Sequence, residues 1–221
     1  MKRVLIFANG EYSSLDFYHN HIMEDDYIIC ADGGTNTAWE AGIIPDMVMG
    51  DFDSIENEVI EKLSFEKTQF IKFSSEKDES DLELSVLKAT TLTPSEIIIF
   101  GALGKRLDHI FGNLMLLTIP LEAGIKGYIL EEDYEIHLID NENEIELDGG
   151  NSSIISLFPL SPVVKGVETR GLKYPLLKED LYLGRSRGLS NEFAENKAWI
   201  KIKEGKLLII KTNNQAPRLT E

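Results

Sequence analysis

Short apolar runs alternate with stretches of helical periodicity up to about residue 120. The runs are rich in β-branched residues and have consecutive apolar positions, as in parallel strands that are buried on both faces. The predicted strands are Val4–Ala8, Tyr27–Ala31, Met47–Met49, Gln69–Phe73 and Ile97–Phe100. The predicted helices between them are Thr35–Ala41, Glu56–Leu63, Leu82–Thr90 and Leu107–Leu117. This alternation predicts a doubly wound, mostly parallel α/β sheet.

Beyond about residue 125, apolar and polar positions alternate within short segments that turn-prone residues separate, which favours an antiparallel β-sandwich. The predicted strands are Gly127–Leu130, Glu135–Ile139, Glu144–Leu147, Ile154–Phe158, Val163–Thr169, Trp199–Lys203 and Leu207–Lys211. We therefore expect two domains, an α/β domain over residues 1–128 and a β-sandwich domain over residues 129–221. The first of these strands can also belong to the N-terminal sheet.

Composition narrows the functional classes. Of the 221 residues, 43% are hydrophobic, which is enough to build a substantial core. The balance of 22 basic against 38 acidic residues gives a net charge of −16, which argues against nonspecific nucleic-acid binding and against anionic membrane surfaces. An acidic cleft would also repel ATP unless a divalent cation intervened, so the charge itself favours a metal.

The remaining compositional signals are modest. The single cysteine, Cys30, lies in an apolar run and is expected to be a buried structural thiol. The apolar run Val4–Phe7 is too short for a signal peptide or a membrane span, so we expect a cytoplasmic protein. His19, His21 and His137 show no spacing that suggests zinc and are expected in loops or at the surface.

The strongest chemical signal is a set of carboxylates in the first half of the chain, most of them after predicted strands. They are Asp32, Asp51, Asp53, Asp78 and Asp81. Acids at the ends of strands in an open α/β sheet usually face the ligand crevice. Clustered hard oxygen ligands suit Mg²⁺ carrying phosphates, and a Walker-type phosphate loop is absent from the sequence. The pattern predicts a phosphate-handling enzyme that uses a carboxylate-held metal.

Each acidic motif also has a plainer explanation. Asp51 and Asp53 would point the same way in an extended segment and repel each other unless a cation or proton lies between them, but Gly50–Ser54 can equally be a surface turn. Asp78–Asp81 can cap the next helix, which is compatible with phosphate binding at a helix start. The glycines of Asp32-Gly33-Gly34 permit close approach of a ligand or simply form a tight turn.

The segment Gly101–His109 again follows an apolar strand and combines a glycine loop with two cations and an acid. Arg106 can clamp phosphate oxygens in a bidentate fashion. Asp108 can orient that arginine or bind a metal, and His109 is either a base or a structural helix residue. The spacing is not Gly-x-Gly-x-x-Gly, so a dinucleotide fingerprint is absent.

In the second half, two segments combine an aromatic ring with small amides and hydroxyls. They are Gly171–Leu176 and Gly188–Phe193. Such a set suits a flat heteroaromatic ligand, and a cationic ring would gain from the face of Tyr174. The alternative is ordinary loop chemistry in a β-sandwich.

Taken together, the ordered motifs resemble those of the thiamine pyrophosphokinase (thiamine diphosphokinase) family. Any one of them alone is weak, whereas the whole set in this order is highly specific. The motifs are Ala31-Asp32-Gly33-Gly34-Thr35-Asn36, Gly42-Ile43-Ile44-Pro45-Asp46, Gly50-Asp51-Phe52-Asp53-Ser54-Ile55, Asp78-Glu79-Ser80-Asp81-Leu82, Gly104-Lys105-Arg106-Leu107-Asp108-His109, Gly171-Leu172-Lys173-Tyr174-Pro175-Leu176 and Ser190-Asn191-Glu192-Phe193.

The resemblance implies a transferase that moves a diphosphate from ATP to the hydroxyl of thiamine, giving thiamine diphosphate and AMP. It also implies Mg²⁺ and a homodimer whose thiamine pocket lies between the subunits. The catalytic residues that it implies are Asp51, Asp53, Asp81, Arg106 and Asp108, with the metal held by the first three. The nucleotide-side residues are Asp32, Gly33, Asp78, Ser80, Gly101, Gly104 and His109, and the thiamine contacts are Tyr174, Ser190 and Asn191.

Two positions depart from the family pattern. Ser80 replaces the usual threonine but keeps its hydroxyl, and Lys105 stands where a small residue is common. Three other functions stay open from the residues alone. They are a diphosphokinase for another heteroaromatic alcohol such as a hydroxymethylpterin, a non-catalytic nucleotide or thiamine sensor, and a metal-dependent phosphohydrolase.

Overall fold

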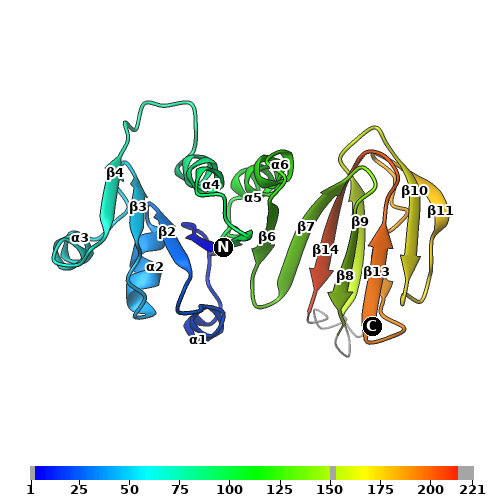
Figure 1. The fold of residues 1–221 in the computed structure, drawn as a ribbon, viewed down its shortest axis with the longest axis horizontal. Coiled ribbons are helices and arrows are strands. Elements are labelled where there is room, and N and C mark those ends of the chain that lie inside the picture. Colours follow the sequence, from blue (N-terminus) through cyan, green and yellow to red (C-terminus); the bar gives the residue numbers. More distant parts are fainter. Residues whose placement is uncertain (1–2, 150–152, 214–221) are drawn as a thin grey trace. The chain divides into compact units, whose positions relative to one another are not determined.

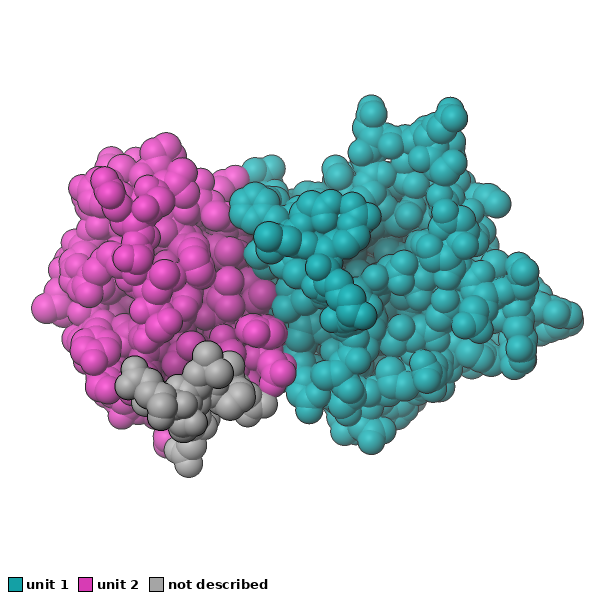
Figure 2. All heavy atoms as spheres, turned by 180° about the vertical axis from the view of Figure 1, so that it is seen from behind, with its two compact units in different colours: residues 1–132 teal, residues 133–221 magenta. Residues whose placement is uncertain are grey.

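The computed structural model describes residues 3–149 and 153–213. The chain divides into two compact units, residues 1–132 and 133–221, which are coloured separately in Figure 2. The predicted boundary between residues 128 and 129 lies a few residues before the division in the structure.

The first unit contains a parallel sheet with the strand order β6-β5-β1-β2-β3-β4 (Figure 1). Its strands are β1 (Val4–Phe7), β2 (Tyr27–Ala31), β3 (Met47–Gly50), β4 (Gln69–Lys72), β5 (Glu96–Phe100) and β6 (Lys126–Leu130). The chain moves outward from β1 to β4 and then returns to place β5 on the other side of β1. This reversal is a topological switch point, where open α/β sheets bind their ligands. The predicted doubly wound, mostly parallel sheet is confirmed.

Helices cover both faces of this sheet. They are α1 (Leu15–Asn20), α2 (Gly34–Glu40), α3 (Asn57–Leu63), α4 (Asp81–Thr91), α5 (Leu107–Met115) and α6 (Thr118–Glu122). Leu5 and Phe7 pack in one core cluster with residues of α1, α2 and α3. Val4 and Ile6 alternate with them and point to the opposite face, where α4 contacts β1, β2, β3 and β5. The continuous apolar runs therefore reflect burial on both faces.

The second unit consists of two antiparallel sheets, with the strand orders β12-β9-β14-β7 and β11-β10-β13-β8. Its strands are β7 (Tyr134–Asp140), β8 (Glu144–Asp148), β9 (Ile154–Pro159), β10 (Val163–Arg170), β11 (Leu177–Tyr182), β12 (Asn191–Glu192), β13 (Lys197–Lys201) and β14 (Lys206–Thr212). Alternate residues such as Ile155, Leu157, Ile200 and Ile209 form one buried cluster that includes strands of both sheets. The predicted antiparallel sandwich is confirmed.

Three polar side chains, those of Lys211, Glu135 and His137, form a largely buried cluster on β14 and β7. Lys211 on β14 pairs directly with Glu135 on β7, at 2.9 Å between Nζ and Oε2. The imidazole of His137 lies 2.8 Å from the other carboxylate oxygen of Glu135 and is only 4% exposed. The expectation that His137 lies in a loop or at the surface is therefore wrong, because its carboxylate neighbour lets it be buried in a strand.

None of the helices in the described part of the chain is both long and apolar enough to cross a membrane.

Candidate active site

A cavity of about 460 Å³ opens at the carboxyl ends of the strands in the first unit. Its walls come from segments that follow β1, β2, β3 and β5 and from the starts of α4 and α5. These segments supply Ala8–Glu11, Ala31–Asp32, Ser54, Ser80–Leu82, Gly101–Arg106 and His109. Register pairs Phe7 with both Cys30 and Phe100, so the central strands end level with one another at the switch point.

Three carboxylates converge beside this cavity. Asp32, Asp51 and Asp53 each offer an oxygen, and these oxygens all lie within 4.8 Å of one another. The backbone of Phe52 has a φ of +69°, so the segment adopts the turn, one of the two conformations that the sequence left open, and not the extended one. A tight turn brings the two acids together instead, with the Asp53 N–H donating to Oδ1 of Asp51 at 3.1 Å. The structure thus brings the two predicted acids together, and their role in metal binding stays a prediction.

The turn that carries Asp51 and Asp53 is anchored from both sides. Asn36 of α2 donates from Nδ2 to the carbonyl of Ser54 and accepts the N–H of Glu56. The ring of Phe52 packs edge-on against Phe70 of β4, with 5.9 Å between ring centroids. These contacts give the unusual backbone a fixed shape, which is typical of a binding turn.

The electrostatics around Asp32 favour a bound cation. Asp32 is only 6% exposed, and its Oδ1 has no hydrogen-bond partner within residues 3–149 and 153–213. Burial raises the pKa of Asp32, and the negative charges of Asp81 and Asp51 raise it further, against hydrogen bonds from Ser54 and the Gly33 N–H. A divalent cation would pair the orphaned oxygen and remove the repulsion. The donor set therefore fits a magnesium ion.

The glycines beside Asp32 are explained by packing. A Cβ on Gly34 would lie 2.2 Å from the carbonyl oxygen of Phe7, and one on Gly33 would collide with the side chain of Asn9. Gly33 and Gly34 thus let α2 begin directly against the end of β1. The sequence left two explanations for these glycines, close approach of a ligand and a tight turn, and the packing supports the tight turn. The same packing places Asp32 at the edge of the cavity.

At the start of α4, capping and cavity lining coincide. Ser80 accepts the N–H of Glu83 at 3.1 Å and caps the helix, as the sequence predicts. Asp81 lines the cavity, but its Oδ1 lies 2.9 Å from Nζ of Lys77 and is not part of the three-carboxylate group. Asp78 is exposed and is not among the described cavity-lining residues. The structure therefore brings Asp32, rather than Asp81, next to Asp51 and Asp53.

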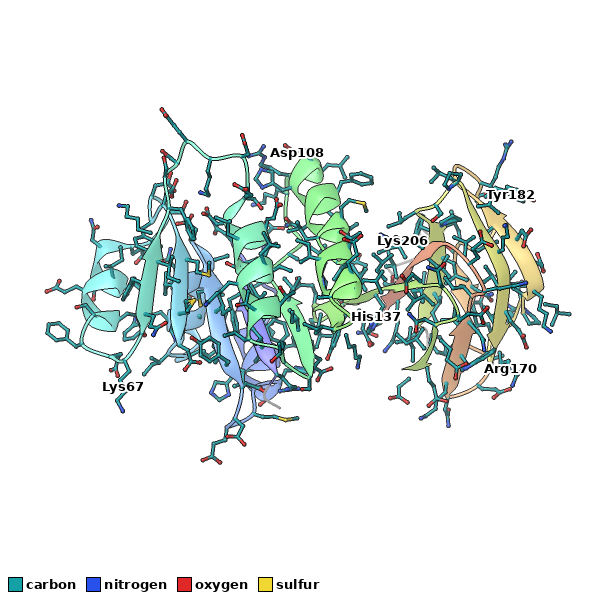
Figure 3. The ribbon with its side chains drawn as sticks, turned by 45° about the horizontal axis from the view of Figure 1, so that its top comes forward. Lys67, Asp108, His137, Arg170, Tyr182 and Lys206 are labelled. Carbon is teal, nitrogen blue, oxygen red and sulfur yellow. The ribbon has the colours of Figure 1, made fainter. Side chains whose placement is uncertain are left out.

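Arg106 and Asp108 form an exposed pair at the start of α5. Their side chains are each 67% exposed, and Nη2 of Arg106 lies 2.7 Å from Oδ2 of Asp108. The hydrogen bond to Arg106 lowers the pKa of Asp108. Figure 3 shows Asp108 at the exposed N-terminal end of α5. Asp108 thus pairs with Arg106, which lines the cavity together with Gly101, Gly104 and His109.

The second unit carries a separate, shallower cavity of about 330 Å³. Tyr174 and Asn191 line it, and the Asn191 amide bonds to the backbone of Tyr174 in both directions, at 3.0 and 2.7 Å. Asn191 is 6% exposed and therefore holds the Tyr174 loop in place. Ser190 adopts a φ of +54° and donates its N–H to Ser156, but it does not line the described cavity.

Comparison with known proteins agrees with both halves of this arrangement. The family model described as "Thiamin pyrophosphokinase, catalytic domain" matches residues 18–129, and that described as "Thiamin pyrophosphokinase, vitamin B1 binding domain" matches residues 137–207. The chain belongs to the thiamine pyrophosphokinase family.

Individual relatives support this family assignment. A thiamine pyrophosphokinase of Bacillus subtilis is 31% identical over 97% of this chain and all of its own length. A crystal structure of thiamine pyrophosphokinase from the same species superimposes with a TM-score of 0.87 at 29% identity, covering 97% of this chain and 100% of that one. Thiamine pyrophosphokinase 2 of Arabidopsis thaliana is 28% identical over 74% of this chain and 69% of its own length.

Within this family member, Asp32 provides a direct stability test. Asp32→Asn is expected to raise the free energy of unfolding of the ligand-free protein by about 1 kcal/mol at pH 7, because it removes a buried charge that repels Asp51 and Asp81. Asparagine also tolerates the φ of +45° at this position. The same variant should lose most of the stabilisation that Mg²⁺ gives the wild-type protein. Urea unfolding with and without Mg²⁺ measures both effects.

Asp46→Asn is the matched control for this test. The Asp46 carboxylate accepts the N–H of Ile28 at 2.7 Å. An amide oxygen in its place is a weaker acceptor because it carries no charge, so this variant should lose some stability. A loss of stability in Asp32→Asn as large as that in Asp46→Asn would contradict the cation-site interpretation.

Two residues beside the first cavity were not identified from the sequence. Lys77 lies four residues before Asp81, a spacing that favours an ion pair, but the sequence does not place that pair at a cavity. Glu131 follows the apolar strand β6, the same signature that marks Asp32 after β2. It is buried and contacts the loop after β5.

Proposed function

We propose that this chain is an ATP-dependent thiamine diphosphokinase, which transfers a diphosphate from ATP to the hydroxyl of thiamine and releases AMP. The observation that carries the proposal is the convergence of Asp32, Asp51 and Asp53 at the switch-point cavity of a thiamine pyrophosphokinase family member. A sensor would not need crowded carboxylates that repel each other. A pterin diphosphokinase is not favoured, because a vitamin B1 binding model matches the second unit.

In this proposal Asp32, Asp51 and Asp53 hold Mg²⁺, which when bound neutralises charge on the phosphate oxygens of ATP. Asp81 lies close enough to raise the pKa of Asp32, and Lys77 compensates part of its charge. Lys77 contacts Asp81, which lines the cavity, and we propose that it exchanges this contact for a phosphate oxygen when the nucleotide enters.

The other groups around the cavity position the reactants. Arg106, held by Asp108, would offer a guanidinium to the developing charge. Ser80–Leu82 at the start of α4 line the cavity, and the first N–H groups of a helix suit phosphate oxygens. The thiamine oxygen forms a bond to the β-phosphorus while the bond from that phosphorus to the AMP oxygen breaks. The hydroxyl proton passes to a carboxylate. Positioning and electrostatics then supply most of the rate acceleration.

On the thiamine side, we assign Tyr174, Ser190 and Asn191 to substrate binding. Tyr174 is 56% exposed, and the ammonium group of Lys173 already lies 5.5 Å from its ring centroid. In this proposal the other face of the Tyr174 ring contacts the cationic thiazolium of thiamine. Large exposed apolar side chains on the second unit, including Leu177 and Leu183, support a homodimer in which a partner subunit covers this surface. We also propose a cytoplasmic location.

Mass spectrometry of the products tests this function. Incubation with ATP, Mg²⁺ and thiamine should give equal amounts of AMP and thiamine diphosphate, and neither should form without thiamine. Parallel reactions with a hydroxymethylpterin should leave ATP unchanged. Phosphate release without an acceptor would indicate a phosphohydrolase, and thiamine binding without AMP would indicate a sensor; either result would contradict the proposal.

A further inference from the structure

A buried carboxylate outside the acid cluster holds one wall of the first cavity. Glu131, directly after β6, is 5% exposed. Its Oε1 accepts the N–H of Ala102 at 2.9 Å, and its Oε2 accepts the hydroxyl of Tyr18 at 2.7 Å. Both oxygens of this side chain are therefore engaged, one by the loop after β5 and one by α1.

The loop that Glu131 contacts is the one that faces the cavity. Gly101, Ala102 and Leu103 all line it, and Ala102 is fixed on its other side by Asn113, whose Nδ2 donates to the Ala102 carbonyl at 2.7 Å. The carbonyl of Leu103 accepts the N–H of Glu11 at 2.7 Å, which ties the loop to the segment after β1. The backbone amide of Ala102 thus has the carboxylate of Glu131 as its side-chain acceptor.

We propose that Glu131 is a positioning residue that, in its ionised form, holds the Gly101–Leu103 loop in the shape that binds the nucleotide. This inference rests on the proposed function only in taking the switch-point cavity as the nucleotide site. Glu131 does not line the described cavity and acts through the loop. A carboxylate can accept from the loop and from Tyr18 at once, whereas a protonated carboxyl must turn one oxygen into a donor.

The protonation of Glu131 falls in an accessible range. Burial raises its pKa to about 7, against the hydrogen bond from Tyr18 and those from the backbone amides of Gly101, Ala102 and Leu103. Among the described residues, Tyr18 of α1 and Tyr12 of the segment before α1 interact electrostatically with Glu131, and the pKa of each is raised above its ordinary range. Both tyrosines therefore stay neutral near pH 7. Nucleotide affinity should rise with pH through this range as Glu131 ionises.

The test is calorimetric binding of Mg²⁺ and α,β-methylene-ATP, a non-transferable analogue, to the full chain between pH 6 and pH 9. Glu131→Gln should weaken binding at least fivefold at pH 8 and should remove the wild-type pH dependence that remains after the titration of the nucleotide itself is subtracted. Tyr18→Phe keeps the carboxylate but loses a hydrogen bond that favours ionisation. The midpoint of the pH dependence of nucleotide affinity should therefore move to higher pH in Tyr18→Phe.

Glu132→Gln is the matched control, because it removes the same charge from the next, exposed position. It should bind as the wild type does. Unchanged affinity and pH dependence in Glu131→Gln, or an unmoved midpoint in Tyr18→Phe, would overturn the proposal. Because the readout is binding, failure of the diphosphokinase assignment would show separately, as absence of AMP and thiamine diphosphate from the wild-type reaction.

Discussion

Replacing Asp51 or Asp53 by asparagine is expected to lower kcat by about 1,000-fold while the protein stays folded. Both carboxylates belong to the three-oxygen group, and each substitution replaces a charged ligand by a neutral amide. Removing a repelling charge from a partly exposed turn should not lower the melting temperature. Steady-state assays at saturating Mg²⁺, thiamine and ATP, together with thermal unfolding, measure the two effects.

Asp25→Asn is the control for these variants. Asp25 is exposed in the same unit and does not belong to the three-carboxylate group, so its loss should leave kcat unchanged. Near-normal turnover by both Asp51→Asn and Asp53→Asn at saturating Mg²⁺ would be incompatible with a metal held by this cluster.

Glu135→Gln is expected to reduce the free energy of unfolding of the second unit by about 2–3 kcal/mol. The substitution leaves the ammonium of Lys211, whose side chain is 10% exposed, without its carboxylate. Burial alone would raise the pKa of Glu135, but the hydrogen bonds and charges of His137 and Lys211 outweigh it and lower that pKa to about 2. Urea unfolding of the full chain, followed with a signal that reports on the second unit, measures the loss in its free energy of unfolding.

The pH dependence of this effect follows from the sign of the shift. Because the folded pKa of Glu135 lies below its ordinary value of 4.5, its contribution is complete above that value and disappears as pH falls toward 2. Glu135→Gln should therefore flatten the stability curve in that window. Glu168→Gln, which removes the partner of the exposed Arg170, should cost less than about 1 kcal/mol. Equal losses in the two variants would contradict the buried-pair account.

Much of the fold could be predicted because its strands are marked by burial. In the first unit the predicted strands match β1–β5 within one residue at each end. Residues such as Leu5 and Ile29 are enclosed on both faces, whereas the edge strand β4 is only partly buried. The predicted strand at Gly127–Leu130 pairs in parallel with β5 and so belongs to the first sheet. The predicted strand at Trp199–Lys203 overlaps β13 but begins and ends two residues later than it.

The elements that were missed are short or exposed. Helices α1 and α6 have six and five residues, too few to show a helical period, and α6 contains Pro120. Strand β11 is exposed at most of its positions and lacks alternation, while β12 has two residues. Their positions depend on tertiary packing, which local patterns do not record.

The candidate site was predictable in its acids and less so in its contacts. Asp51 and Asp53 were predicted as metal ligands and Asp32 as a nucleotide-side residue because they follow predicted strands, and parallel strands end at one edge of the sheet. The third predicted ligand, Asp81, lies outside the three-carboxylate group, where Asp32 takes its place. The pairing of Asp81 with Lys77 and the inward turn of Asn191 depend on side-chain conformations that the sequence does not fix. Glu131 carried the same strand-end signature, but no neighbouring glycine marked it as part of a site.

The most direct test of the central claim is a crystal structure with Mn²⁺ and α,β-methylene-ATP. The account predicts an anomalous peak coordinated by oxygens of Asp32, Asp51 and Asp53, with the analogue's phosphates in the cavity beside the Gly101–Leu103 loop. A metal and nucleotide bound away from these carboxylates would contradict it.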